Sequence, residues 1–174
     1  MSESPLSTRL IQTVGISTTL LIGGANIAYS VVLVPRILES PTPLLVRQWD
    51  HAYEQGKRSI PPVAVFSGIS YFYLAYNEHT AAFPASWKVP AYATAGVLAA
   101  SMIPYTLVFM LRNVNKLKAK LAETSALQNT DEVVEVGLGS ETAHKLVDDW
   151  AVMNLGRGAM LTISGVLGLW TALN

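Results

Sequence analysis

The chain has 174 residues, of which 51% are hydrophobic and only 14% are charged, and its mean hydropathy is +0.34. This composition is more apolar than that of an ordinary soluble domain and predicts one small membrane domain. The twelve basic and twelve acidic residues cancel, which argues against a nucleic-acid partner. The absence of cysteine excludes disulfides, thiolate metal sites and a cysteine nucleophile.

Four apolar segments are expected to cross the membrane as helices: residues 11–34, 60–76, 89–111 and 155–173. The second and fourth are short for a full crossing, so we expect their helices to continue beyond the hydrocarbon or the bilayer to thin there. Pro35 is expected to close the first helix, Pro61 and Pro62 to open the second and Pro90 to open the third. The predicted fold is all-α: a four-transmembrane-helix bundle in a single domain, residues 1–174, with two longer loops.

Basic residues outside these segments lie mostly on one side. One side carries ten of them: Arg36, Arg47, Lys57, Arg58, Arg112, Lys116, Lys118, Lys120, Lys145 and Arg157. The opposite side carries only Arg9 and Lys88. The positive-inside rule therefore predicts that loops 35–59 and 112–154 are cytoplasmic and that both termini face the lumen or exterior. We expect an intracellular membrane, such as the endoplasmic reticulum.

The first segment is rich in small residues, among them the pair Gly24 and Ala28, four positions apart. Small residues let helices approach closely in lipid, so we expect this helix to pack within the bundle, with a homo-oligomer through it as a further possibility. Asn26 lies in mid-span. Because an amide in hydrocarbon is costly without a partner, Asn26 should point into the bundle.

Two loop features are predicted. Trp49 and Tyr53, four residues apart, would share one face of a short interfacial helix that Gly56 ends, either as membrane anchors or as part of a site. Residues from about 119 to 139 lack a helical period, so we expect a mobile loop there. Ser140 would then cap a helix that runs from Thr142 into the fourth segment.

Histidines are few: His51, His79 and His144. His144 and Asp148 are spaced as helical neighbours, which suits metal ligation or a carboxylate that orients an imidazole. No third ligand is fixed by spacing, so ordinary surface histidines are the alternative.

Trp150, Asn154 and Arg157 are spaced i, i+4 and i+7 and therefore lie on one helix face. Arg157 could simply extend to the lipid headgroups. The other possibility is a binding site shared with Tyr105, next to a kink at Pro104, and with Asn113 and Asn115 at a similar depth. Aromatic, amide and guanidinium groups suit a flat, phenolic, anionic ligand better than a metal ion.

Several short motifs between residue 26 and about residue 170 now come together. They are Tyr29-Ser30 with Pro35; Trp49, Tyr53 and Gly56; Pro104-Tyr105-Thr106 through Met110; Asn113 and Asn115; and Leu146-Val147 with Trp150, Asn154 and Arg157. Together they resemble the fungal anthrone oxygenases, a family of small four-helix membrane proteins. Two departures stand out: residues 122–139 have no counterpart, and Arg112 occupies a position where proline or a small residue is expected.

The resemblance implies a monooxygenase that uses O2 to oxidise a polyketide anthrone to the anthraquinone in the biosynthesis of fungal secondary metabolites such as pigments or mycotoxins. It points to four candidate catalytic residues: His51, His144, Arg157 and Asn154. The candidate substrate-binding residues are Trp49, Tyr53, Tyr105, Asn113, Asn115 and Trp150. A histidine would take a proton from the substrate, and Arg157 with amide donors would stabilise the anion.

An electron-rich anion can itself reduce O2, so we predict no flavin or haem, while a histidine-bound metal stays open. The sequence also lacks a phosphate-binding glycine loop and a dinucleotide fingerprint. The rival interpretation is non-enzymatic: a membrane scaffold or partner-binding subunit whose Trp, Asn and Arg side chains are interfacial anchors.

The predicted sidedness can be tested by glycosylation mapping. An acceptor tag inserted at residue 125 should stay unmodified in microsomes, because the loop after the third segment is predicted to be cytoplasmic. The same tag appended after Asn174 should be glycosylated and serves as the control. Modification at residue 125 would reverse the predicted topology.

Overall fold

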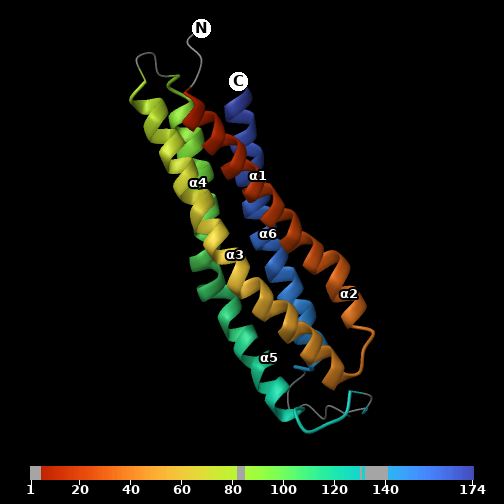
Figure 1. The fold of residues 1–174 in the computed structure, drawn as a ribbon. Helices are drawn as coiled ribbons and strands as arrows, with labels where there is room; N and C mark the ends of the chain where they lie inside the picture. The colour runs from red at the N-terminus through yellow and green to blue at the C-terminus, as the bar shows by residue number, and fades with distance from the viewer. Residues whose placement is uncertain (1–4, 82–84, 130, 132–140) are drawn as a thin grey trace.

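The protein is a bundle of four long, antiparallel helices, seen in a computed structural model that describes residues 5–81, 85–129, 131 and 141–174 (Figure 1). The first helix comprises α1 (Leu6–Ala28), a π-helical segment η1 (Tyr29–Leu33) and α2 (Val34–Ile37). The second is α3 (Thr42–His79). The third comprises α4 (Lys88–Tyr105), π-helical η2 (Thr106–Met110) and α5 (Leu111–Glu123), and the fourth is α6 (Ala143–Leu173). The described residues contain no strand, so the all-α, four-helix prediction is confirmed.

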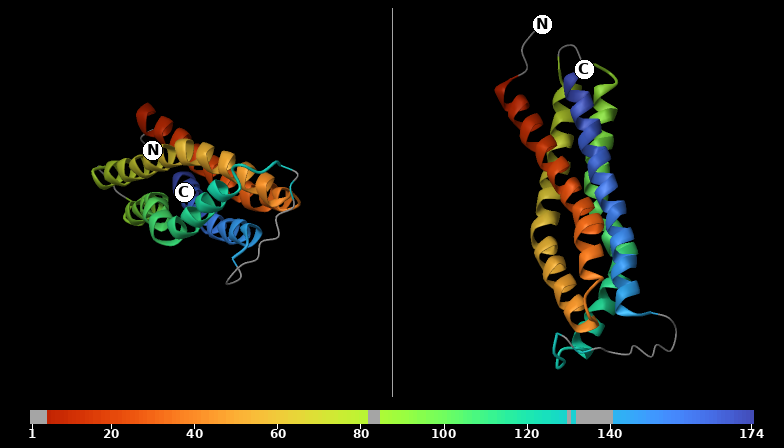
Figure 2. Two further views of the ribbon diagram at one scale, coloured as in Figure 1. Left: turned by 90° about the horizontal axis from the view of Figure 1, so that it is seen from below. Right: turned by 90° about the vertical axis from the view of Figure 1, so that its right-hand side faces the viewer.

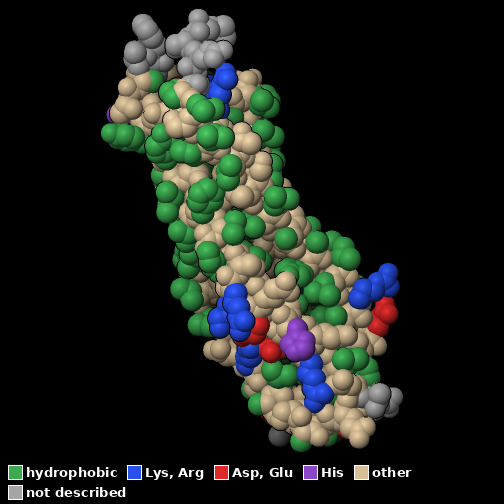
Figure 3. Space-filling model, in the orientation of Figure 1, with side chains coloured by type: hydrophobic (Ala, Val, Ile, Leu, Met, Phe, Trp, Pro, Cys, Tyr) green, Lys and Arg blue, Asp and Glu red, His purple; other side chains and the backbone are tan. Residues whose placement is uncertain are grey.

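Three of the four helices are long and apolar enough to cross a membrane: Leu6–Ile37, Lys88–Glu123 and Ala143–Leu173. The protein is therefore an integral membrane protein. The first residues of α1 and the last residues of α6 lie at one end of the bundle (Figure 1), and charged side chains gather toward the other end (Figure 3). The α3 helix carries many charges in its first half, and the crossing predicted for residues 60–76 remains a prediction.

Gly56, Pro61 and Pro62 all lie inside α3, which corrects two predictions. Gly56 does not end an interfacial helix, and the proline pair does not open a new one. Each proline removes the N–H that would bond the carbonyl four residues back, here those of Lys57 and Arg58. Both residues are exposed, so solvent can satisfy these carbonyls.

The predicted loops 35–59 and 112–154 are therefore largely helical. At 1.5 Å per residue the 38 residues of α3 extend over roughly 57 Å, well beyond a hydrocarbon core of about 30 Å. The α5 helix likewise continues to Glu123, so the predicted loop at 119–139 begins later than expected. The N-cap of α6 is Thr142, whose hydroxyl accepts from the Lys145 N–H at 3.2 Å. The predicted cap Ser140 lies outside the described residues.

Two prolines accompany the π-helical segments. Pro35 follows η1 inside α2, so it does not close the first helix, and Pro104 precedes η2 near the end of α4. The N–H of Val34 bonds the Tyr29 carbonyl, and that of Leu111 bonds the Thr106 carbonyl, each five residues back. A π turn contains one residue more than an α turn, so it rotates every side chain that follows it about the helix axis.

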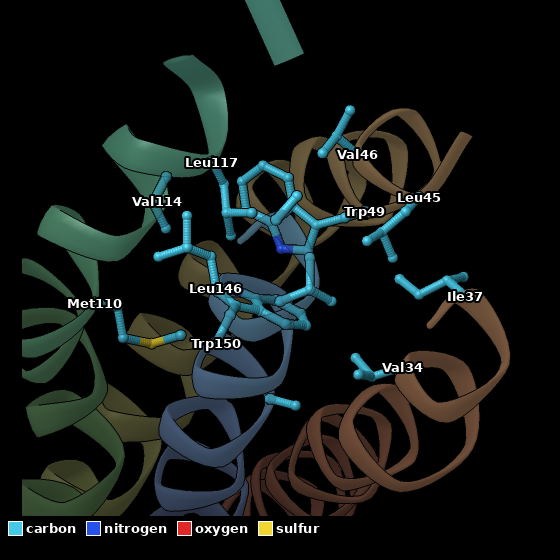
Figure 4. Packing of buried hydrophobic residues seen from close by; sticks show 13 residues of the cluster. Val34, Ile37, Leu45, Val46, Trp49, Met110, Val114, Leu117, Leu146 and Trp150 are labelled. Carbon is cyan, nitrogen blue, oxygen red and sulfur yellow. The ribbon is translucent and has the colours of Figure 1, made fainter. Parts of the chain in front are cut away.

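Two hydrophobic clusters fill the bundle, one toward each end. At the charged end, Trp49 is fully buried and meets Trp150 edge-to-face with ring centroids 6.2 Å apart (Figure 4). Tyr53 stacks on the other side of Trp49 at 5.2 Å. Aromatic pairs of this kind contribute about 0.5–1.5 kcal/mol each beyond burial, and the pair of Trp49 with Trp150 joins α3 to α6.

Glycines bring α1 and α6 together, and the two helices cross closely (Figure 2). A Cβ on Gly23 would lie 2.8 Å from Thr162 Oγ1 and 3.0 Å from the Thr162 backbone nitrogen. Gly24 and Ala28, the small pair expected to pack in the bundle, are instead exposed, and nothing lies within 4 Å of a Cβ on Gly24. The face of α1 that packs closely against α6 therefore contains Gly23, one residue before the predicted Gly24.

A matched pair of substitutions tests this packing. Gly23→Ala should lower bundle stability by about 1–3 kcal/mol, because the new methyl group meets the α6 backbone. Gly24→Ala adds the same methyl group in open space and should be neutral or slightly stabilising, since alanine favours helix. Thermal unfolding of detergent-solubilised protein measures both. Equal transition midpoints for the two variants would contradict the assignment of the close face.

Candidate functional site

A pocket of about 370 Å³ lies among η1, α3, α6 and the third helix, at the level of the two π-helical segments. Its size falls in the range of roughly 300–1,000 Å³ typical of small-molecule sites. The lining residues are Tyr29, Ala52, Tyr53, Gly56, Lys57, Ile60, Pro61, Met102, Ile103, Thr106, Leu107, Leu111, Val114, Asn115, Lys118, Trp150 and Arg157. Most of these side chains are apolar or aromatic, which suits a flat hydrophobic ligand.

Every charged residue that lines the pocket is a cation: Lys57, Lys118 and Arg157. No aspartate or glutamate lines it in the described part of the chain. Lys57 and Lys118 have acidic neighbours outside the wall, whereas none of the ion pairs found among the described residues involves Arg157. The uncompensated positive charge lies at Arg157.

Arg157 is held by neutral groups only. Its Nη2 donates to Asn26 Oδ1 at 2.7 Å and its Nη1 to Thr106 Oγ1 at 3.4 Å. Its Nε is buried and has no hydrogen-bond partner. A guanidinium carries five N–H donors, and a partly buried one is costly without anionic partners. Arg157 therefore has both unused donors and unbalanced charge beside the pocket.

Asn26 and Asn154 hold this arginine in place from behind the pocket wall. Both side chains are fully buried. Asn26 donates to the Ile22 carbonyl at 2.7 Å, which leaves its Oδ1 facing Arg157. Asn154 donates to the Asn26 carbonyl at 2.7 Å and to Ser30 Oγ at 3.0 Å. Asn26 points into the bundle as expected, and Asn154, predicted to be catalytic, does not line the pocket.

Tyr29, Tyr53 and Trp150 supply the aromatic part of the wall. Trp49, predicted to bind substrate, lies behind Tyr53 and Trp150, fully buried between their rings. Burial raises the pKa of the Tyr53 hydroxyl, and the Glu54 carboxylate adds to this against the opposing charges of Lys118 and Arg157. Tyr53 therefore stays protonated at neutral pH and can act as a hydrogen-bond donor.

An ion-pair cluster lies at the charged end of the pocket. Lys118 on α5 pairs with Asp50 and, at 2.7 Å, with Glu54, both on α3. Its ammonium also lies 5.4 Å from the centre of the Tyr53 ring. The hydrogen bond from Lys118 lowers the pKa of the Glu54 carboxyl, so Glu54 stays ionised at neutral pH. These contacts tie α5 to α3.

The remaining predicted binding residues are divided between two environments. Asn115 lines the pocket. Asn113 is buried on another face of α5 and donates to the Leu146 carbonyl at 3.0 Å. Tyr105 turns its hydroxyl to the Met153 carbonyl at 3.2 Å and does not line the pocket. Asn113 and Tyr105 therefore fix α6 against its neighbours.

None of the three histidines lines the pocket. His51 is exposed in a shallow depression with Glu54, Gln55, Arg58 and Ser59, on the other side of α3 from Tyr53. The ring nitrogen Nε2 of His144 is 3.1 Å from the Ser40 carbonyl, and His79 is exposed near the opposite end of the bundle. Within the described ranges, no three His, Cys, Asp or Glu side chains converge as metal ligands.

Four polar residues of the pocket wall were not predicted as site residues: Tyr29, Lys57, Thr106 and Lys118. Tyr29 and Thr106 each begin a π-helical segment, which no sequence period reveals. In the sequence analysis, Lys57 and Lys118 were used only to predict the orientation of the protein in the membrane. For Lys118 a signal existed, because it follows Asn115 by three residues and shares its helix face.

Comparison with known proteins places this chain in a family. The model of the anthrone oxygenase family matches residues 49–167. Anthrone oxygenase AgnL2 of Paecilomyces divaricatus is 31% identical, with 94% of this chain and 95% of the relative aligned. Anthrone oxygenase encC of Aspergillus fumigatus is 32% identical over 94% of this chain and 93% of its own.

Noranthrone monooxygenase of Aspergillus flavus is 26% identical, over 90% of this chain and 70% of the relative. No solved structure matches the chain. The family match lies in the second, third and fourth helices and does not include the first, and it contains every residue of the pocket wall except Tyr29. The chain belongs to the anthrone oxygenase family of enzymes.

Proposed function

We propose that this enzyme oxidises a polyketide anthrone to the corresponding anthraquinone with O2, and that the reaction takes place in the pocket beside Arg157. One observation carries the assignment to this pocket: its wall is aromatic and apolar, its charged groups are all cations, and Arg157 has no acidic partner among the described residues. A flat aromatic anion is the ligand that such a wall complements.

The chemistry begins with the central methylene of the anthrone. This C–H group is acidic because loss of its proton gives the enolate of a fully aromatic anthranol. The anion gives one electron to O2, and the resulting radical pair combines to form a carbon–oxygen bond and a peroxide. Loss of the second methylene proton then breaks the O–O bond, which leaves the quinone carbonyl and releases hydroxide. The hydroxide takes up a proton, equal to the one removed in the first step, and becomes water.

Arg157 is proposed to bind the enolate oxygen. The negative charge on this oxygen is greatest in the anion, so a preorganised guanidinium stabilises the anion more than the neutral anthrone. The Nη1 and Nη2 N–H groups of Arg157 that Asn26 and Thr106 do not use are the donors available for it. Tyr53 and Trp150 would contact the ring faces, and Asn115 a polar substituent.

The base is not assigned to a histidine. His51 and His144 were predicted for this role, but neither reaches the pocket wall. A cation that lowers the pKa of the bound anthrone lets water serve as base. We therefore propose that stabilisation of the anion by Arg157 contributes more than proton removal by a positioned side chain. The reaction as written requires no flavin, haem or metal.

Replacement of Arg157 tests this role. Arg157→Met should lower kcat for emodin anthrone by at least about tenfold, because removal of one oxyanion donor commonly has this effect or more. Arg157→Lys, which keeps the charge and loses the planar fork, should retain part of the activity. Anthraquinone formation and O2 uptake by purified, detergent-solubilised protein are the measurements.

Arg58→Met is the matched control, since Arg58 is an exposed arginine that does not line the pocket. Unfolding midpoints of all variants separate lost catalysis from lost folding, because Arg157 also binds Asn26. Wild-type kcat in a folded Arg157→Met protein would remove Arg157 from the mechanism. No turnover by the wild-type protein above spontaneous air oxidation would count against this substrate and favour a scaffold.

The histidines are tested in the same assay. His51→Ala and His144→Ala should each keep kcat within about twofold of the wild-type value, since neither touches the pocket. A tenfold loss in either folded variant would restore that histidine as a candidate base. If exhaustive chelation abolished turnover and one metal ion restored it, a metal held by these residues would replace the present proposal.

A further inference from the structure

The α3 helix does not pack uniformly along the third helix. It packs extensively against α4 and again meets α5, but it makes no comparable contact with η2 between them. The pocket lies at this interruption and is lined from one side by Ile60 and Pro61 of α3 and from the other by Leu107 of η2 and Leu111 of α5. We call the interval bounded by these four residues the lateral opening.

The side of the lateral opening formed by η2 and α5 faces outward and is apolar. Leu107 is 59% exposed and Leu111 is 43% exposed, although both line the pocket. Val108 and Phe109 beside them are also exposed. All four belong to the helix Lys88–Glu123, which is long and apolar enough to cross a membrane. In a bilayer, these side chains contact lipid.

Both ends of the lateral opening are closed. On the charged side, Lys118 bridges α5 to Asp50 and Glu54 of α3. On the other side, a Cβ on Gly68 of α3 would lie only 3.6 Å from the Gly96 carbonyl of α4, so the two backbones pack closely. A polycyclic molecule that passes between these limits meets hydrocarbon outside and the aromatic wall inside.

We propose that the pocket opens sideways into the bilayer, so that a neutral, membrane-dissolved polycyclic aromatic substrate enters between α3 and η2. This inference rests on the proposed function and deepens it by naming the form of substrate that is admitted. An apolar rim passes the neutral anthrone and excludes its anion, which would lose hydration there. The anion forms only after entry, beside Arg157, and the oxidised quinone leaves by the same route.

Two single-cysteine variants test the route, and the absence of native cysteines makes each introduced thiol unique. Leu107→Cys places the thiol at the lateral opening. Val108→Cys is the matched control, because it is the next residue, is also exposed to lipid and does not line the pocket. Both proteins are reconstituted in phosphatidylcholine vesicles and modified with benzyl methanethiosulfonate, which dissolves in the bilayer.

The benzyl group on Leu107→Cys should lower kcat/KM for emodin anthrone at least about fivefold, whereas the same group on Val108→Cys should change it less than about twofold. Emodin, the quinone product, should slow modification of Leu107→Cys and leave that of Val108→Cys unchanged. This protection reports binding at the opening independently of turnover.

The outcomes separate the two proposals. If wild-type protein and both unmodified variants oxidise the anthrone, but modification affects both variants equally and emodin protects neither, the lateral opening is overturned and the proposed function stands. If wild-type protein neither oxidises the anthrone nor binds emodin, the proposed function fails, and the route that rests on it fails too.

Discussion

The hydrogen bond between Arg157 and Asn26 is the contact on which the rest of the bundle depends. A guanidinium amid apolar helices must be given acceptors, and here a neutral amide from α1 provides the shortest one, at 2.7 Å. Asn26 is itself held by two further hydrogen bonds: its side-chain N–H donates to the Ile22 carbonyl, and its backbone carbonyl accepts from Asn154. The close approach of α1 and α6 at this point is permitted by Gly158, where a Cβ would lie 2.7 Å from Ile27 Cγ1 and 3.2 Å from the Ile27 backbone nitrogen. This one contact therefore constrains the register of α1 against α6, the packing of the two helices and the position of the guanidinium.

The same constraint explains why the site retains binding capacity. A carboxylate in place of Asn26 would neutralise Arg157 and occupy its donors. A neutral partner fixes the guanidinium in one position and leaves its charge uncompensated, which is unfavourable for stability and favourable for binding an anion. The aromatic wall and the ion pairs at Lys118 then determine where such an anion can lie. Stability given up at Arg157 is offset by the buried contacts of Trp49 with Tyr53 and Trp150.

Much of this could be predicted from the sequence, because the relevant rules are local. Helical spacing placed Trp150, Asn154 and Arg157 on one inward face, and the cost of burying an amide placed Asn26 inward. The continuity of α3 through Pro61 and Pro62 could not be predicted, since a proline pair indicates a boundary unless neighbouring helices hold the segment straight. The histidines illustrate a different limit: His51 and Tyr53 are two residues apart, so one helix turns them to different sides, and only the tertiary structure shows which side holds the pocket.

The displacement of Asn113 has a more specific cause. On a regular α-helix, residue 113 would lie on the same face as Thr106, seven positions earlier, and would line the pocket with it. The π turn η2 adds one residue to that interval, so the face that begins at Thr106 continues instead through Leu111, Asn115 and Lys118. Asn113 is thereby rotated toward α6, where it bonds the Leu146 carbonyl. One extra residue in a single turn therefore places Asn115 instead of Asn113 in the pocket wall and brings Lys118 into that wall as well.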